Sequence, residues 1–298
     1  MRPKLRAIKS DTTEWLLYLP ALCRTQWQFA RYGTASRVAV SDHKVVVSLT
    51  SFPERFTRLH NCIKSLLGQT RKPDRLVLYL TQEECADVPI PAALQKLVQH
   101  GLEIRYTSEN LGSFNKFVHA LKEFPDHAIV TCDDDKLYPS NWLAGLIDGH
   151  QKHPGKIICW RSREITLTGN GQLKPYREWP LTTHNAPSFS ILPLGVGGVL
   201  HPPGCFTSEV LDTSLFQALC PTADDLWLKT MAVRTGTAAV QVGPAAVVHP
   251  SIPFWNGNKL SVGNIWGRQN DVSVQRLIEH FGIAPGELAY GPSHASQV

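Results

Sequence analysis

The chain has seven cysteines among its 298 residues, but no two of them form a CxxC pair. An odd count with wide spacing argues against both a disulfide framework and a zinc site. Cys132 and Cys159 lie in apolar runs, where cysteine is more often a small core residue than a nucleophile. The cysteine pattern therefore predicts a protein of a reducing compartment.

A membrane-spanning helix needs about 20 apolar residues, and the sequence has no such run. The most apolar early stretch, residues 15–22, is much shorter, and no signal-peptide cleavage pattern follows it. We therefore expect a cytoplasmic protein. Residues 15–19 could still form an interfacial helix, peripheral on the inner membrane, because basic residues precede them at positions 2, 4, 6 and 9. A helix packed on the domain is the equal alternative.

Internal repeats and low-complexity tracts are also missing. The composition, 43% hydrophobic and 18% charged, lies in the globular range. The net charge of +5 suits an anionic substrate or a membrane surface and does not specify nucleic acid. We expect an N-terminal helical extension over residues 1–43, one catalytic domain over 44–286 and a flexible tail over 287–298.

Apolar runs with strand character alternate with stretches of helical spacing in the first half of the domain. The predicted strands cover residues 45–50, 76–80, 102–106 and 128–132, and the predicted helices cover 59–67, 94–98 and 114–121. This order predicts an α/β fold with a mostly parallel sheet flanked by helices, and ligands at the carboxyl ends of its strands. The second half is mixed, with a helix at 142–150, a strand at 157–161 and a hairpin turn at 168–171.

Three consecutive aspartates, Asp133, Asp134 and Asp135, directly follow the apolar run 128–132. Carboxylates crowded at a strand end repel one another unless a cation shares them. Mg²⁺ and Mn²⁺ prefer oxygen ligands, and Mg²⁺ typically takes only one or two protein carboxylates. Asp133 and Asp135 point the same way if strand geometry persists, so we predict that they bind the metal. A solvated acidic turn is the alternative.

Several segments of the sequence resemble bacterial GT-A glycosyltransferases, and they follow one another in the same order. The resemblance is to family-2-like enzymes of capsule and lipopolysaccharide clusters, including capsular N-acetylglucosaminyltransferases. It covers about residues 44–270 and rests on residues 46–55, Asn110-Leu111-Gly112 with Lys116, and residues 133–135, 195–199 and 223–227. It implies a GT-A fold with 133–135 as the DxD motif. It also implies a nucleotide-sugar donor, most commonly UDP-linked, bound with Mn²⁺ or Mg²⁺.

The donor side of such a site would draw on several loops. A metal held by Asp133 and Asp135 would act as a Lewis acid on the departing diphosphate, while Asp134 would face the ribose or the donor sugar. The remaining candidates for the nucleotide are Thr50, Ser51 and Arg55 at the first strand's end, and Asn110, Gly112 and Lys116 where a helix opens. Surface salt bridges or solvated side chains are the alternatives for Arg55 and Lys116.

The second acidic motif, Asp224 and Asp225, corresponds by resemblance to the acceptor-side motif. One carboxylate would then act as general base on an acceptor hydroxyl, with Asp225 ahead of Asp224. The alternative is structural, because Thr222 as N-cap with Asp225 three residues later has the pattern of a capping box.

Two later features complete the candidate site. His249 would supply a nitrogen ligand to the same metal from the end of a strand at 245–248, although lone histidines usually bind none. Trp255, Asn256 and Lys259 lie in a Gly/Asn-containing stretch that would close on the diphosphate or the acceptor sugar. A turn with a packed tryptophan is the alternative for this stretch.

These observations predict a metal-dependent glycosyltransferase that moves a sugar from a nucleotide donor to a surface-polysaccharide or lipid-linked oligosaccharide acceptor. Inversion and retention of configuration both stay open. A sugar nucleotidyltransferase is the nearest rival, because it also pairs a nucleotide fold with a carboxylate-held metal. A non-catalytic sugar-binding protein of the same fold is the alternative from another class.

Overall fold

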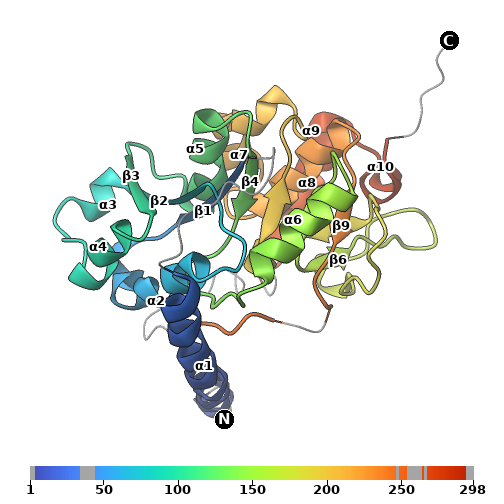
Figure 1. Cartoon of the computed structure of the whole chain (residues 1–298). Coiled ribbons are helices and arrows are strands. Elements are labelled where there is room, and N and C mark those ends of the chain that lie inside the picture. Colours follow the sequence, from blue (N-terminus) through green and yellow to red (C-terminus); the bar gives the residue numbers. More distant parts are fainter. Residues whose placement is uncertain (1–3, 34–43, 246–247, 254–263, 265–266, 293–298) are drawn as a thin grey trace.

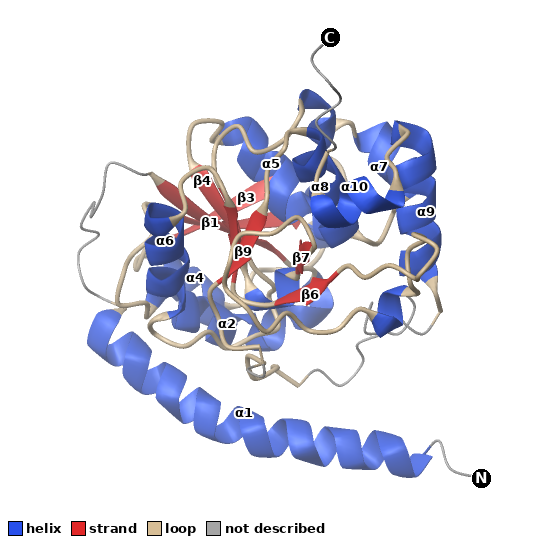
Figure 2. Cartoon of the chain, turned by 90° about the vertical axis from the view of Figure 1, so that its right-hand side faces the viewer, coloured by secondary structure: helices blue, strands red, loops and turns tan. Residues whose placement is uncertain are grey.

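A computed structural model describes residues 4–33, 44–245, 248–253, 264 and 267–292, with the side chains of 4–14 excepted. A central sheet of seven strands, in the order β3-β2-β1-β4-β8-β5-β9, is covered by helices on both faces (Figures 1 and 2). Its strands are β1 Val45–Thr50, β2 Arg75–Thr81, β3 Leu102–Thr107, β4 Ala128–Thr131, β5 Ile157–Cys159, β8 Val199–His201 and β9 Ala239–Gln241. Only β8 runs antiparallel to its neighbours. The predicted mostly parallel α/β fold is therefore confirmed.

The helices of the described residues also follow the predicted alternation in the first half. They are α1 Lys4–Tyr32, α2 Phe56–Leu67, α3 Gln82–Cys85, α4 Ala92–Val98, α5 Asn115–Glu123, α6 Trp142–Lys152, α7 Thr213–Leu219, α8 Asp224–Arg234, α9 Gln269–Phe281 and α10 Pro285–Tyr290. A separate two-stranded sheet pairs β6 Ser162–Glu164 with β7 Ile191–Pro193. It belongs to the mixed second half, which also contains the predicted turn at 168–171, where the Gly171 amide donates to the Thr168 carbonyl at 3.0 Å.

Alternation along β1 explains how the two faces of the sheet are filled. Val45, Val47 and Leu49 belong to the core cluster that includes residues of α2, α4 and α6. Val46 belongs to a cluster with Ala120 and Phe124 at the other face, next to α5. Because successive side chains of a strand point to opposite faces, one run of six apolar or small residues supplies both cores.

Helix α1 packs along α2 through one side. Tyr18 and Ala21 are buried in the same core cluster as α2, and the Gln28 amide donates to the carbonyl oxygens of Ser65 at 2.9 Å and Tyr138 at 3.3 Å. The packed alternative for this segment is therefore correct for that side of the helix. In the described part of the chain no helix is long and apolar enough to cross a membrane.

Three predicted boundaries differ from the structure. β5 ends at Cys159 rather than at residue 161. The strand expected at 245–248 lies earlier, as β9, with Ala245 in a turn and Val248 in no regular element, while 246–247 lie outside the described residues. Leu288 and Ala289 of α10 are buried in a core cluster. Packed structure therefore extends past the boundary predicted at residue 286.

Candidate active site

The three aspartates lie where β4 ends, at the carboxyl edge of the parallel strands, but each has a different partner. Asp134 is the most enclosed, with an exposed fraction of 5%. It accepts a hydrogen bond from Ser51 Oγ at 2.5 Å and forms an ion pair with Arg55. Burial raises the pKa of Asp134 to about 6, although the Arg55 charge partly offsets this effect. Ser51 and Arg55 therefore hold the middle aspartate in place.

Arg55 also reaches the third aspartate. Its Nη1 lies 3.7 Å from Asp135 Oδ2, and its guanidinium stacks over the Phe52 ring at 4.9 Å from the centroid. The prediction that Arg55 lies at this strand end is therefore correct, and its partners are the aspartates rather than a surface group. The side chain is fixed by an aromatic face and two carboxylates, as the planar guanidinium allows.

Lys116 joins the two acidic motifs that lie far apart in the sequence. Its Nζ lies 3.0 Å from Asp133 Oδ1 and 3.0 Å from Asp224 Oδ2. Burial alone would lower the pKa of Lys116, but the charges of Asp133 and Asp224 outweigh burial and raise it well above the ordinary value. Burial would raise the pKa of Asp133, and the Lys116 charge instead lowers it. A single internal cation therefore connects the end of β4 with the start of α8.

Asp225 lies beside this bridge without a direct cation partner of its own. Its Oδ1 accepts the Gly195 amide hydrogen at 2.9 Å. Burial and the neighbouring Asp224 charge raise the pKa of Asp225 to about 8, and Lys116 opposes this shift. A carboxyl group with a raised pKa near the working pH suits general acid–base chemistry.

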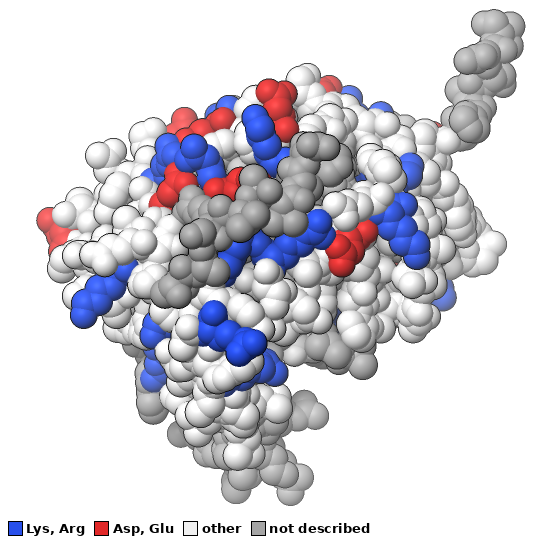
Figure 3. Space-filling model, viewed as in Figure 1, with Lys and Arg blue, Asp and Glu red and all other residues white. Residues whose placement is uncertain are grey.

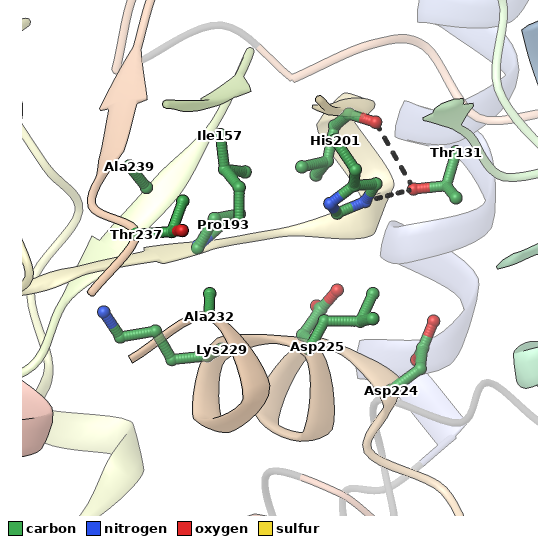
Figure 4. Close-up of a pocket in the computed structure, with 12 residues that line it drawn as sticks. Thr131, Ile157, Pro193, His201, Asp224, Asp225, Lys229, Ala232, Thr237 and Ala239 are labelled. Carbon is green, nitrogen blue, oxygen red and sulfur yellow. Dashed lines mark hydrogen bonds between the residues drawn. The ribbon is translucent and has the colours of Figure 1, made fainter. Parts of the chain in front are cut away.

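A cavity of about 20 Å³, room for about one water molecule, lies between α8 and the sheet. Asp224 and Asp225 line one part of it and Lys229, a turn further along α8, lines another (Figure 4). His201 Nε2 lies 3.3 Å from Thr131 Oγ1 above them, and burial lowers the pKa of His201 to about 3, so this imidazole is neutral.

The capping-box alternative for the second acidic motif is wrong. Helix α8 begins at Asp224, its N-cap is Ala223, and no side chain caps it. Thr222 instead donates its hydroxyl to Asn264 Oδ1 at 2.8 Å. Asp225 is consequently one position too early to be the third residue of a box. Acidic side chains in the first turn of a helix still interact favourably with the helix dipole. Both carboxylates also have specific partners, because Asp224 pairs with Lys116 and Asp225 accepts the Gly195 amide hydrogen.

Other donor-side candidates are held by local bonds. Thr50 donates its hydroxyl to the Tyr79 carbonyl at 2.9 Å, and Asn110 uses its Oδ1 to accept the Gly112 amide at 3.0 Å and its amide to donate to Glu84. Gly112 has a φ of 58°, which favours glycine. A short 3₁₀ turn, Gly112–Phe114, precedes α5, so the first residue of that helix is Asn115. These contacts define the loop shape and leave a nucleotide role as a prediction.

His249 lies in an aromatic setting. Its Nε2 donates to the Gly197 carbonyl at 3.2 Å, and its ring packs against Tyr138 and Trp160. Burial lowers its pKa to about 4, so it is neutral, as a metal ligand must be. Within the described ranges no three His, Cys, Asp or Glu side chains form a group that could hold a metal. The three-ligand set of Asp133, Asp135 and His249 is therefore not assembled in this structure.

A smaller oxygen site does fit the residues present. Asp135 Oδ1 is buried and accepts no hydrogen bond from the described residues, and its ion-pair contact is with Lys136 Nζ at 3.5 Å. A buried carboxylate oxygen without a donor is costly unless a cation completes it. Mg²⁺ and Mn²⁺ need only one or two such oxygens from the protein.

Trp255, Asn256 and Lys259 lie outside the described residues.

Sequence reasoning missed two residues of this site, Lys136 and Tyr138, and missed the contact made by Gly195, which it names only within the resemblance over residues 195–199. Lys136, directly after the aspartates, donates to Ser251 Oγ at 2.6 Å and contacts Asp135. The Tyr138 hydroxyl accepts the Asp133 amide hydrogen at 3.0 Å. The Gly195 backbone amide binds Asp225. The charge of Lys136 and the aromatic ring of Tyr138, which follow the triplet, are signals that the sequence shows. The contact of a backbone amide cannot be recognised from the sequence.

Residues 49–206 match the family model described as glycosyl transferase family 2. No curated protein matches the sequence. Among solved structures, the mannosyltransferase PcManGT from Pyrobaculum calidifontis, in complex with GDP-Man and Mn²⁺, shares 13% identity at a TM-score of 0.47, covering 91% of this chain and 76% of that one.

Two other solved structures are similar at comparable levels. The 4-diphosphocytidyl-2C-methyl-D-erythritol synthase from Anaerococcus prevotii shares 10% identity at a TM-score of 0.44, covering 79% of this chain and 99% of that one. S. aureus TarS 1–349 shares 11% identity at a TM-score of 0.42, covering 82% and 74%. The assignment rests on the family match, which spans more than half of the sequence and includes the aspartate triplet and Gly195. This chain belongs to glycosyl transferase family 2 and is a glycosyltransferase.

Proposed function

We propose that the protein transfers a sugar from a UDP-linked donor, with Mn²⁺ or Mg²⁺, to a surface-polysaccharide or lipid-linked oligosaccharide acceptor. One observation carries the proposal: Lys116 brings Asp133 of the strand-end triplet and Asp224 of α8 to the same point, 3.0 Å from its Nζ in each case. The triplet side suits a diphosphate and its cation, and the α8 side suits a hydroxyl. A transferase needs both at one place.

Asp133 and Asp135 are the residues that would hold the metal. The Oδ1 of Asp135, which accepts no hydrogen bond from the described residues, and the carboxylate of Asp133 are oxygen ligands of the type that Mg²⁺ and Mn²⁺ take. When bound, such a cation stabilises the negative charge that develops on the departing nucleoside diphosphate. Arg55 and Ser51 keep Asp134 turned inward for the ribose or the donor sugar.

Asp225 is the proposed base. The acceptor hydroxyl loses its proton to Asp225, its oxygen bonds to the anomeric carbon, and the bond from that carbon to the phosphate oxygen breaks. The Gly195 amide holds Asp225 Oδ1 and leaves Oδ2 for the proton. Direct displacement of this kind inverts the anomeric centre. Asp224 stays paired with Lys116, and in this way it positions the neighbouring Asp225.

A product assay separates this proposal from nucleotidyl transfer. Purified protein is screened against nucleotide sugars with Mn²⁺, and the released nucleotide is identified by chromatography, with thermal shift reporting donor binding. Release of nucleoside diphosphate supports sugar transfer. Release of pyrophosphate from a nucleoside triphosphate and a sugar phosphate would instead assign a nucleotidyltransferase, and binding without turnover would assign a sugar-binding role.

The metal assignment has its own test in Asp135→Ala. The substitution removes a proposed ligand and no core side chain, so we expect metal-dependent donor binding to be lost while the fold is retained. Calorimetry of UDP-sugar binding with and without Mn²⁺ measures the effect. The matched control is Asp148→Ala, which removes an exposed carboxylate paired with Arg71 outside the site. Unchanged metal-dependent affinity in Asp135→Ala would remove Asp135 from the metal site.

A further inference from the structure

The outward side of α1 has an unusual composition. Between residues 15 and 33, nine side chains of this helix are exposed, seven of them apolar and two of them arginine. They are Leu16, Leu17, Leu19, Pro20, Cys23, Arg24, Trp27, Ala30 and Arg31. A helix on the surface of a soluble domain normally turns polar residues to solvent. Between residues 15 and 33 this helix exposes no acidic side chain, and its neutral hydrogen-bonding groups there are the Trp27 indole N–H and the Cys23 thiol.

Polar residues of α1 face the domain instead. Thr25 and Gln28 are each 1% exposed. The side-chain amide of Gln28 donates to the carbonyl oxygens of Ser65 and Tyr138. The side chain of Gln26 is hydrogen-bonded to those of Asn61 and Lys64. The side of α1 that faces the domain therefore carries both apolar side chains, such as Tyr18 and Ala21, and polar ones, and the domain does not account for the apolar side chains that face away from it.

The exposed apolar residues form one stripe along the helix. Leu16, Leu19, Cys23 and Trp27 follow one another at spacings of three or four residues, which places them on the same face. Their large members are well exposed, with Leu16 at 68% and Trp27 at 59%. Arg24 and Arg31 flank the stripe, and Arg31 lies over the Trp27 ring, 5.6 Å from its centroid. Long cationic side chains beside an apolar stripe are typical of helices that lie in a membrane interface.

We propose that this side of α1, called here the lipid face and defined by Leu16, Leu19, Cys23, Trp27 and the flanking Arg24 and Arg31, docks on an anionic lipid bilayer. Charge selects this occupant. Symmetric contact with a second copy would bring the same apolar and basic patch against itself, and the exposed residues described between 15 and 33 include no acidic side chain to neutralise the arginines. Lipid phosphates supply the missing charge, and basic residues near an anionic bilayer surface are attracted to it.

The surroundings agree with this occupant. In the view of Figure 3, the surface around the junction of α1 with the domain shows basic side chains and no acidic ones. The sequence adds four more basic residues upstream, at positions 2, 4, 6 and 9, against acidic residues at 11 and 14. Because the opposite side of α1 is packed on α2, the helix presents only this one face to a bilayer.

Docking would bring the membrane surface close to the catalytic end of the sheet. Trp15 of α1 lies under the Arg58 guanidinium, 4.9 Å from its ring centroid, and Arg58 in turn donates to the Pro253 carbonyl. Arg58 stands one turn after Arg55, which binds the aspartates. The inference goes beyond the proposed function and does not depend on it, although an acceptor presented at the bilayer would be close to the site.

The native cysteines allow a direct test on the full chain. Cys23 is exposed within the lipid face and the other six cysteines are buried. An environment-sensitive thiol dye at Cys23 is expected to shift to the blue with vesicles of two parts phosphatidylcholine and one part phosphatidylglycerol, and much less with phosphatidylcholine alone. An emission that stays water-like with both vesicles overturns the proposal.

Vesicle co-sedimentation of unlabelled protein provides the second measurement. Leu16→Gln with Leu19→Gln is expected to weaken partitioning about tenfold or more, because two exposed leucines leave the interface. The matched control, Val98→Gln with Val272→Gln, removes exposed apolar residues elsewhere and should bind as the wild type does. Arg24→Gln with Arg31→Gln should weaken the preference for the anionic vesicles, with part of it retained by the basic residues upstream. Equal partitioning by the leucine and valine variants refutes the lipid face.

Two further measurements distinguish loss of lipid docking from loss of dimerisation and from loss of donor binding. Light scattering without vesicles that gives a dimer for the wild type and a monomer for Leu16→Gln with Leu19→Gln would assign the face to a second copy and overturn the proposal. UDP-sugar binding measured without vesicles should be equal in the wild type and the leucine variant. Loss of docking therefore leaves the test of the proposed function unaffected.

Discussion

Asp225 is the residue on which the proposed chemistry depends most. It lies near Asp224 and Asp133, and Lys116 forms ion pairs with both of these neighbours. Burial and Asp224 raise the pKa of Asp225 to about 8, while Lys116 lowers the pKa of Asp133. Neighbouring carboxyl groups with pKa values pushed apart have different roles. Asp133 suits a permanently charged ligand, and Asp225 suits a group that takes up a proton.

Asp225→Asn tests this role. The amide keeps the size of the side chain and its oxygen can still accept the Gly195 hydrogen, but it cannot take a proton from the acceptor. We expect kcat to fall about a hundred- to ten-thousandfold with little change in donor affinity. Steady-state turnover with the true acceptor and calorimetry with the donor measure the two quantities separately.

Asp224→Asn is the paired variant for this experiment. Near-wild-type turnover in Asp225→Asn together with its loss in Asp224→Asn would show that Asp224 is the base. Retention of turnover in both variants would mean that the base lies elsewhere or that the enzyme retains configuration.

The dependence of the rate on pH follows from the same carboxyl group. A base works only when deprotonated, and the pKa of Asp225 is about 8, so kcat/KM should rise between pH 7 and pH 9. The ordinary carboxyl value would instead place the rise near pH 4. A profile of kcat/KM from pH 5 to pH 10 decides between them. A rate already at its plateau at pH 6 would contradict an Asp225 base with a raised pKa.

At the scale of elements, the site depends on the segment between β7 and β8. This segment begins with a 3₁₀ turn, Gly195–Gly197, that brings the Gly195 amide to Asp225. A Cβ at position 195 would lie 3.2 Å from both Asp225 Oδ1 and Lys116 Nζ, and 3.8 Å from Asp133 Oδ1. Backbone and catalytic side chains are thus in close contact, and glycine makes that contact possible.

Gly195→Ala is expected to disturb catalysis more than folding. The added methyl group must move Asp225 or Lys116 by a few tenths of an ångström, which should lower kcat about tenfold or more with a Tm close to the wild-type value. Gly169→Ala is the matched control, because a Cβ there meets no atom within 4 Å. Equal kcat in the two variants would show that position 195 tolerates the methyl group without displacing Asp225.

The first four strands could be predicted from sequence because each is a short apolar run between polar turns. Residues 45–50 match β1, and 128–132 differ from β4 by one residue. In the second half, β5 is predicted with two residues too many at its end, whereas β8 and β9 are not predicted, because each has only three residues and pairs across a long connection. Three residues carry no measurable period, so strand β8, which lies beside β4, was not predicted.

Prediction of the site followed the same division. The aspartates and Arg55 were found because charges at strand ends stand out against apolar runs. The lysine that joins Asp133 to Asp224 was assigned to the nucleotide, because a side chain on a helix gives no sign of which distant carboxylates surround it. Contacts between residues 116 and 224 depend on how the two halves of the sheet meet, which periodicity within each half cannot show.

At the scale of the whole molecule, a lysine buried within the second half of the chain has consequences for stability. Lys229 of α8 is 3% exposed, and its Nζ donates to the Phe189 carbonyl. Burial lowers the pKa of Lys229 to about 7. The unfolded chain therefore binds more protons than the folded one between about pH 7 and the ordinary lysine value of 10.5, and this group makes stability rise with pH across that window.

Lys229→Met should remove that dependence. At pH 6 the wild type must bury a charged amine, so the variant is expected to be the more stable of the two, and its advantage should shrink by a few kcal/mol towards pH 10, since each pKa unit is worth about 1.4 kcal/mol. At pH 10 the variant still lacks the hydrogen bond to the Phe189 carbonyl, which costs it about 1 kcal/mol. The raised pKa of Asp225 has the opposite effect on stability, but Asp225 is present in both proteins, so its contribution cancels in the comparison.

Urea unfolding at pH 6, 8 and 10 measures the difference in stability between the two proteins. Lys152→Met, at an exposed position on α6, is the control. A stability difference between wild type and Lys229→Met that does not change with pH would show that Lys229 stays charged in the folded protein.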